Sequence, residues 1–333
     1  MSEQNKLNGL QIARAFAALS IAYFHSWRVT MQFPANTDHP ISILKNNGWV
    51  AVDFFFAISG FVICLVATKP NFRPFQFLTK RAFRLYPLLF VTSFIYLYLT
   101  HFVGRTERQT DQFFYYSLTL LPTDGFPFFD VAWSLQHEMA FYVLTSLIVP
   151  FGGVAGLIGA MLAGIALDHI IALPWYLHQL INYYPNFLIG IAVFLIHKRV
   201  SHIGSIIPFG ISAVAFYLVV HIFNLPRIYY AFPLFFLLIA FLNIKSSQET
   251  RLGKLGSMLG DASYSMYLIH PLIFTYIYIN LQPPLPPLWT QELIRAGAFI
   301  ALCCIACASW FLLERPAMKL GDNVVGRIFR NNR

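Results

Sequence analysis

Charge is scarce in this chain of 333 residues, because Asp, Glu, Lys and Arg together make up 11% of it. A typical soluble domain carries about 25% charged residues. The sequence also lacks polar linkers, low-complexity tracts and obvious internal repeats. Hydrophobic residues instead make up 57% of the chain and aromatic residues 17%, and the mean hydropathy is +0.60. This composition excludes a soluble globular protein and predicts an integral membrane protein.

Cysteine is scarce as well, and its placement argues against disulfides and against a metal site. The four cysteines lie in apolar segments, whereas a disulfide framework would lie in exposed loops, and no metal ligands stand at suitable spacing. We therefore expect reduced packing residues and no bound metal. The polar start MSEQNKLNGL is not followed by a small-residue cleavage site, so the first apolar run is expected to remain as a helix.

Ten apolar segments predict membrane-spanning helices, since about 20 apolar residues cross the hydrocarbon core. No further domain separates these segments. We therefore predict an all-α bundle of about ten transmembrane helices that forms one domain over residues 1–333, without an appended periplasmic domain. The segments are residues 8–29, 48–68, 86–103, 132–149, 152–170, 180–197, 203–223, 228–243, 261–281 and 291–313.

The formal net charge of +9 is explained by membrane orientation. The basic residues lie between the hydrophobic runs, which is typical of the positive-inside pattern and argues against nucleic-acid binding. With the N-terminus in the cytoplasm, sixteen Lys and Arg residues fall on the inner side and six on the outer side. Both termini are therefore predicted to be cytoplasmic.

The first apolar segment, LQIARAFAALSIAYFHSWRV, contains Arg14 and His25. Eleven residues correspond to about three helical turns, so the two side chains share a face and stand about 16 Å apart along the axis. Charged residues inside a membrane helix are costly and usually functional. One interpretation is a snorkelling arginine and a histidine satisfied by a neighbouring helix. The other, which we favour, is a lined channel or cavity.

Two carboxylates are predicted at about the depth of His25. Asp53 and Glu138 each lie a few residues below the outer end of a predicted helix. A histidine next to a carboxylate is how enzymes orient a general base. The alternative is a structural polar cluster that holds the helices together. His137 points about 100° away from Glu138 around its helix and is interpreted as a bystander.

A basic cluster follows the second segment on the predicted cytoplasmic side. Lys80, Arg81 and Arg84 are spaced to cover one side of a short helix at the membrane surface. Clustered guanidinium groups suit phosphate binding, whereas contact with anionic lipid head groups explains the same pattern. The sequence leaves these two interpretations open.

Small residues recur at every fourth position of the fifth segment, at Gly152, Gly156, Ala160 and Gly164. This pattern predicts the close approach of two helices.

Taken together, the motifs resemble those of acyltransferase family 3, the bacterial integral-membrane O-acyltransferases. Each motif is weak alone, but their order and placement cover essentially the whole chain. They are Arg14-x10-His25, VDFFFAISGF (Val52–Phe61), KRAFRLYP (Lys80–Pro87), WSLQHE (Trp133–Glu138), GDASYSMYLIHP (Gly260–Pro271) and LLERP (Leu312–Pro316).

The resemblance implies an enzyme of the bacterial inner membrane that takes an acyl group, usually acetyl, from cytoplasmic acetyl-CoA. The acceptor would be a hydroxyl of a periplasm-facing polysaccharide, such as exopolysaccharide or lipopolysaccharide, or of a lipid-linked oligosaccharide. By the same resemblance Lys80, Arg81 and Arg84 would hold the CoA phosphates, Arg14 would contact the CoA arm, and His25 would be the catalytic base. Asp53 or Glu138 would then orient the imidazole.

Two further residues of these motifs are given structural roles. For His270 a hydrogen bond at the proline kink is favoured over catalysis, and Glu314 is expected to pair with Arg315 at the membrane interface.

Two other functions compete with the enzyme. A transporter would use the polar stripe as a proton or solute path, but the expected internal repeat is not found. A scaffold for polysaccharide assembly would explain the bundle and leave the aligned polar residues unexplained.

Overall fold

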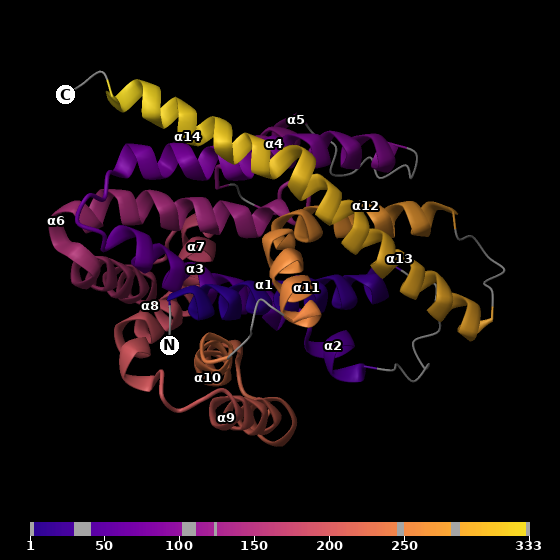
Figure 1. Ribbon diagram of the computed structural model, residues 1–333, viewed down its shortest axis with the longest axis horizontal. Helices are drawn as coiled ribbons and strands as arrows, with labels where there is room; N and C mark the ends of the chain where they lie inside the picture. Colours follow the sequence, from indigo (N-terminus) through magenta and orange to yellow (C-terminus); the bar gives the residue numbers. More distant parts are fainter. Residues whose placement is uncertain are drawn as a thin grey trace. The chain divides into compact units, whose positions relative to one another are not determined.

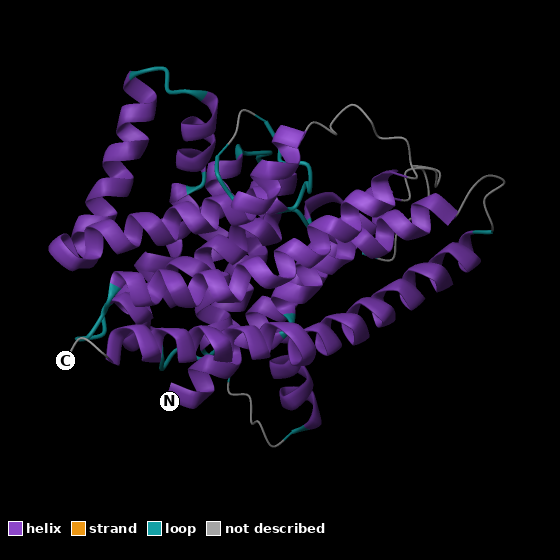
Figure 2. Cartoon of the chain, turned by 90° about the horizontal axis from the view of Figure 1, so that it is seen from above, coloured by secondary structure: helices purple, strands orange, loops and turns teal. Residues whose placement is uncertain are grey.

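The computed structural model describes residues 3–29, 41–101, 111–122, 125–244, 250–280 and 287–330. Within these residues helix is the regular structure and strands are absent (Figure 2). Figure 1 traces the helices in chain order. They are α1 (Glu3–Val29), α2 (Ser42–Asn47), α3 (Val50–Ala67), α4 (Pro74–His101), α5 (Asp111–Thr119), α6 (Ala132–Ile170), α7 (Trp175–Asn182), α8 (Tyr184–Val200), α9 (Ile206–Tyr217), η2 (Leu218–Ile222), η3 (Arg227–Tyr230), α10 (Ala231–Leu242), α11 (Arg251–Asp261), α12 (Ser263–Asn280), α13 (Leu288–Ser309), η4 (Trp310–Glu314) and α14 (Arg315–Arg330).

Five helical stretches in the described part of the chain are long and apolar enough to cross a membrane. Two shorter apolar helical stretches, Ile206–Ile222 and Arg227–Leu242, accompany them. The all-helical architecture of the described residues, with several candidate membrane-spanning helices, is thereby confirmed, while the count of ten spans and the cytoplasmic termini stay predictions. The five stretches are Val50–Ala67, Pro74–His101, Ala132–Ile170, Trp175–Val200 and Trp289–Ile328.

Two of the predicted segment boundaries differ in the structure. The basic cluster and the third predicted span form one helix, α4, which continues through Pro87. The fourth and fifth predicted spans are joined in α6, which bends where Gly153 adopts φ 60° and ψ −161°. Glycine reaches this conformation without the penalty that a Cβ would impose. The predicted break near Pro150 therefore falls three residues later in the chain.

The chain divides into two compact units, and unit 1 comprises residues 1–17, 50–74 and 137–261. Its centre is the close packing of α3 against α8. At Gly60 a methyl group would collide with the backbone of Phe187, and at Gly190 it would collide with the backbone of Ala57. Both glycines are buried. The absence of side chains at these two positions is therefore what lets the helix backbones touch.

The predicted small-residue stripe in the fifth segment does not make such an approach. A methyl group at Gly152 or Gly156 would meet only Ile148 of the same helix, and at Gly164 it would meet the side chain of Tyr184. The predicted close approach is therefore not made at Gly152 or Gly156, while at Gly164 the neighbour is a side chain of α8. The close contact of helix backbones is between α3 and α8.

Unit 2 comprises residues 18–49, 75–136 and 262–333, and α12 lies at its core. Every residue from Ser263 to His270 is buried. The Tyr264 hydroxyl donates to the Leu85 carbonyl at 2.7 Å, and the Tyr267 hydroxyl lies 2.6 Å from Ser134 Oγ. The motif SYSMYLIH is therefore the segment of α12 that α4 and the start of α6 pack around.

The end of the chain adds a second contact to α12. Glu314 is 2% exposed, and its Oε1 accepts a hydrogen bond from Ser265. Ser265 Oγ also lies 3.0 Å from the hydroxyl oxygen of Ser309. Glu314 stands at the end of the π-helical turn η4, where Arg315 is exposed. The expected interfacial pairing of Glu314 with Arg315 is therefore replaced by a buried contact with α12.

Candidate functional site

His25 lies on α1, in unit 2, beside a second histidine. Its ring centroid is 5.1 Å from that of His270 on α12, and the two planes are tilted by 33°. His25 is half-buried, whereas His270 is fully buried. Phe24 meets the His25 ring edge-on at 5.3 Å. The predicted catalytic histidine and the histidine of the SYSMYLIHP motif therefore form a pair of neighbouring imidazoles.

Arg14 lies in unit 1, on the N-terminal part of the same helix, and is connected to a carboxylate through Gln11. Arg14 Nη1 donates to Gln11 Oε1 at 3.2 Å, and Gln11 Nε2 donates to Asp261 Oδ1 at 2.6 Å. A methyl group at Gly260 would lie 2.6 Å from the Gln11 Cα. Gly260 therefore lets the end of α11 approach α1, and Asp261 can then orient the amide that holds Arg14.

Glu138 lies on α6 and faces α3. Its Oε1 accepts hydrogen bonds from Ser59, at 3.1 Å, and from the hydroxyl of Tyr142 one turn further along the helix. Ser59 belongs to the FAISGF part of the second-segment motif. The carboxylate therefore connects two of the sequence motifs within unit 1, and the side chain is half-buried.

Asp53 has a partner that sequence reasoning missed. Arg227 Nε donates to Asp53 Oδ2 at 3.0 Å, and Arg227 Nη2 donates to Oδ1 at 2.5 Å. Asn186 donates to the same Oδ1 at 2.9 Å. Arg227 Nη1 also donates to the Tyr183 hydroxyl, and its guanidinium lies 4.5 Å from the Tyr183 ring centre. Asp53 is 1% exposed, so this bidentate pair supplies the counter-charge that a buried carboxylate needs.

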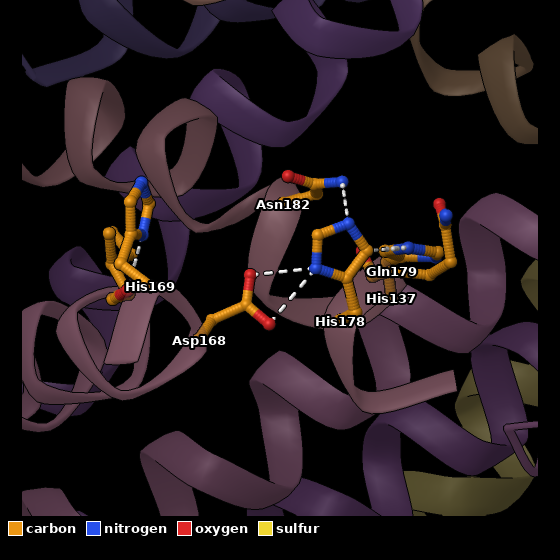
Figure 3. A network of polar contacts seen from close by, with 7 residues as sticks. His137, Asp168, His169, His178, Gln179 and Asn182 are labelled. Carbon is orange, nitrogen blue, oxygen red and sulfur yellow. Dashed lines mark hydrogen bonds and ion pairs between the residues drawn. The ribbon is translucent and has the colours of Figure 1, made fainter. Parts of the chain in front are cut away.

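His137 is part of a polar network that joins α6 to α7, shown in Figure 3. Its Nε2 lies 3.1 Å from the Gln179 carbonyl oxygen, so this nitrogen is the donor. On the residue before Gln179, the His178 Nδ1 contacts both oxygens of Asp168 at 2.8 and 2.9 Å, and Asn182 donates to its Nε2 at 3.2 Å. His137 therefore contacts the short helix α7, and its predicted bystander role in catalysis stays a prediction.

The predicted phosphate site lies on the first turns of α4, in unit 2. Lys80 Nζ forms an ion pair with Asp322 of α14 at 2.7 Å, and both side chains are exposed. The Arg81 guanidinium lies 5.2 Å from the Phe77 ring centre. A methyl group at Gly321 would meet the Phe83 side chain. Helix α14 therefore packs directly against the basic cluster.

All the predicted site residues lie in the described part of the chain. Arg14, Asp53 and Glu138 are described within unit 1, and His25, Lys80, Arg81 and Arg84 within unit 2. The shared site of His25 with the two carboxylates stays a prediction. Within the described residues, groups of three or more His, Cys, Asp or Glu side chains arranged to hold a metal ion are absent.

Comparison with known proteins agrees with this set of motifs. The family model for the acyltransferase domain of acyltransferase family 3 matches residues 7–315. The chain is 27% identical to the exopolysaccharide production protein ExoZ of Rhizobium meliloti (strain 1021), over 82% of this chain and 90% of that protein. It is 25% identical to ORF330 of the Acidianus two-tailed virus, provisionally named as an acetyltransferase, over 92% of this chain and 90% of that protein. No solved structure matches the chain.

The family model covers all the residues singled out above on α1, α3, α4, α6 and α12. The match also includes Glu314, whose buried contact with Ser265 joins the last two sequence motifs. The chain therefore belongs to acyltransferase family 3.

Proposed function

We propose that this protein is a membrane O-acetyltransferase of the bacterial inner membrane, which moves an acetyl group from cytoplasmic acetyl-CoA to a sugar hydroxyl on the periplasmic side. The observation that supports it most is the match of residues 7–315 to the acyltransferase family 3 model, a range that includes Arg14 and His25 on the continuous helix α1. The exopolysaccharide-related name of one relative supports a polysaccharide or lipid-linked oligosaccharide as the acceptor.

In this mechanism His25 acts as the general base. Its neutral imidazole takes the proton of the sugar hydroxyl while the oxygen forms a bond to the thioester carbonyl carbon. The carbon–sulfur bond then breaks, and the imidazolium returns the proton to the CoA thiolate. The overall reaction is balanced, because the hydroxyl proton ends on CoA and the acetyl group ends on the sugar. No metal ion or other cofactor takes part.

The donor end of the site is assigned to the basic side chains. Arg81, Arg84 and Lys80 are proposed to bind the CoA phosphates, since guanidinium groups pair with phosphate in a bidentate way. Arg14, held by Gln11 and Asp261, would contact the arm of CoA. The arm would then carry the thioester along α1, over the roughly 16 Å that eleven helical residues span.

The two carboxylates receive different roles. Ser59 and Tyr142 both donate to Oε1 of Glu138, so the second oxygen is the atom we assign to orienting an imidazole or binding the sugar hydroxyl. In Asp53 both oxygens accept hydrogen bonds from Arg227. We therefore propose that Glu138 supports the base most directly and that Asp53 acts through the framework around it.

The proposal is tested by acetyl transfer in membranes with labelled acetyl-CoA and a polysaccharide acceptor. His25→Ala should abolish transfer while leaving acetyl-CoA binding in place, and Arg14→Ala should weaken the use of acetyl-CoA. Near-normal turnover in His25→Ala would remove His25 from the mechanism. If the purified protein does not turn over acetyl-CoA at all, transport becomes the better explanation of the intramembrane polar residues.

A further inference from the structure

His270 contains a buried polar atom that the fold does not explain. The residue is 0% exposed, and its Nε2 has no hydrogen-bond partner among the described residues. Leaving a buried donor or acceptor unsatisfied costs about 1–3 kcal/mol. Native proteins contain few such groups, and each one requires a reason.

The hydrogen bond made by the other ring nitrogen, Nδ1, determines whether Nε2 is a donor or an acceptor. The Nδ1 atom lies 3.3 Å from the Met266 carbonyl oxygen, one turn back along α12. A carbonyl oxygen only accepts, so Nδ1 carries the hydrogen and, in the neutral ring, Nε2 carries the lone pair. A purely structural histidine next to Pro271 would explain the bond at Nδ1 and would leave the lone pair at Nε2 unexplained.

Among the ring contacts of His270 in the described residues, the shortest centroid distance is to His25. Apart from His25, the rings close to His270 are those of Tyr267, at 5.7 Å, and Phe274, at 6.2 Å. Fully buried, His270 has no bulk water to satisfy Nε2. At a centroid separation of 5.1 Å and a tilt of 33°, two imidazoles are close enough to share one N–H···N hydrogen bond after a small rotation.

We propose that His270 is the positioning residue of His25, with its Nε2 lone pair accepting a hydrogen bond from an imidazole N–H of His25. This inference rests on the proposed role of His25 as the base. A hydrogen bond to one nitrogen of a histidine fixes the tautomer and turns the other nitrogen toward its task. His270 would thus present the lone pair of His25 to the acceptor hydroxyl.

The same contact helps the reaction as charge develops. When His25 takes the hydroxyl proton, it becomes an imidazolium with two N–H donors, one of which needs an acceptor in this apolar environment. The lone pair of His270 supplies that acceptor, while the bond from its Nδ1 to Met266 keeps the ring in place. His270 gains no proton, so the balance of the reaction is unchanged: the proton passes from the hydroxyl to His25 and then to CoA.

The test compares two amides that each replace one nitrogen of His270. In His270→Gln the side-chain amide reaches about as far as Nε2, whereas in His270→Asn it reaches only as far as Nδ1. A positioning role predicts that Gln keeps kcat within about tenfold of wild type and that Asn lowers it by about 100-fold, the typical contribution of general-base chemistry. The KM for acetyl-CoA should stay unchanged in both variants. A structural role predicts the reverse order, because Asn retains the bond to Met266.

Two further variants complete the experiment. His270→Phe keeps the ring volume and should lose as much kcat as His270→Asn. His197→Phe is the matched control, because the Nδ1 of His197 also bonds a backbone carbonyl, that of Phe194 at 2.5 Å, and it should retain wild-type kcat. Folding is followed by the acetyl-CoA dissociation constant and by monodispersity in detergent. If one of the three His270 variants fails to fold, the kcat values of the other two still distinguish a positioning role from a structural role.

The outcomes separate this inference from the proposed function. Wild-type turnover in His25→Ala would overturn the proposed function itself. Loss of turnover in His25→Ala together with wild-type kcat in His270→Asn or His270→Phe would overturn the role of His270 alone.

Discussion

The close packing of α3 and α8 allows a stability prediction that is independent of the catalytic mechanism. Replacing Gly60 by Ala adds one methyl group. That methyl carbon would lie 3.0 Å from the carbonyl carbon and 3.2 Å from the Cα of Phe187, and closer still to the carbonyl oxygen. All three are backbone atoms, so no side-chain rotation can relieve the clash. The two helices must therefore move apart, and the packing along their contact is loosened.

The expected magnitude follows from two opposing terms. Overpacking in a well-packed core costs about 1–3 kcal/mol and occasionally more, whereas Ala favours a helix over Gly by about 1 kcal/mol. Because the clash is with backbone, we place the net loss of stability in Gly60→Ala at about 1–3 kcal/mol. For a chain of 333 residues this corresponds to a melting temperature lowered by roughly 1–4 °C.

The matched control is Gly159→Ala on α6. This glycine is exposed, and an added methyl group would have nothing within 4 Å. The gain in helix propensity should then leave the melting temperature unchanged or slightly raised. The double variant Gly60→Ala/Gly190→Ala should lose less than the sum of its two single variants, because helices already separated by the first methyl group accommodate the second more easily.

A thiol-reactive dye in detergent provides the assay. Cys64 follows Gly60 by one turn on α3 and is fully buried, so it reacts when the contact between α3 and α8 opens. Replacing Cys303, Cys304 and Cys307 by Ala makes Cys64 the reporting thiol. If Gly60→Ala and Gly159→Ala shift the transition equally, the close backbone contact of Gly60 is refuted.

Two further predictions concern the charged pairs. Asp322→Asn should strengthen acetyl-CoA binding about two- to fivefold by releasing Lys80 from an exposed ion pair worth at most about 1 kcal/mol. Titration calorimetry at low and high salt checks this, because the increase in affinity should become smaller as salt screens the charges. An unchanged affinity would place Lys80 outside the CoA site. Arg227→Ala should reduce the fraction of folded protein, since it leaves the carboxylate of Asp53, which is 1% exposed, without the arginine that neutralises it. Adding Asp53→Asn removes the unpaired charge and should restore much of the monodisperse fraction. If it does not, loss of the Asp53–Arg227 pair is not the cause of the reduced folding.

The sequence pattern was sufficient to predict the helices that carry the site, because apolar length and periodicity are local properties. The first span, with Arg14 and His25, is the helix α1. How far a helix continues beyond its apolar segment is determined less by the local sequence. Pro87 is tolerated inside α4, so the basic cluster is joined to a spanning helix instead of forming a separate surface helix.

The partners of polar residues were harder to predict, since they depend on contacts distant in sequence. A lone carboxylate inside a membrane is costly, so a partner for Asp53 could be expected. Its partner Arg227 lies 174 positions away in the sequence and could not be identified from local pattern. A single arginine directly after Pro226, between two apolar segments, was the signal available. The small-residue stripe misled for a similar reason. A pattern of glycines indicates that a close approach is possible, while single glycines such as Gly60 and Gly190 can make one without any repeat.

The central claim, that this chain acetylates a surface polysaccharide through His25, is tested most directly by mass spectrometry of cell-surface polysaccharides. Cells lacking the gene are compared with cells complemented by the wild-type protein or by His25→Ala at equal membrane levels. We predict that acetyl mass increments disappear in the deletion, return with the wild-type protein and stay absent with His25→Ala. Unchanged acetylation in the deletion strain, or full restoration by His25→Ala, would contradict the claim.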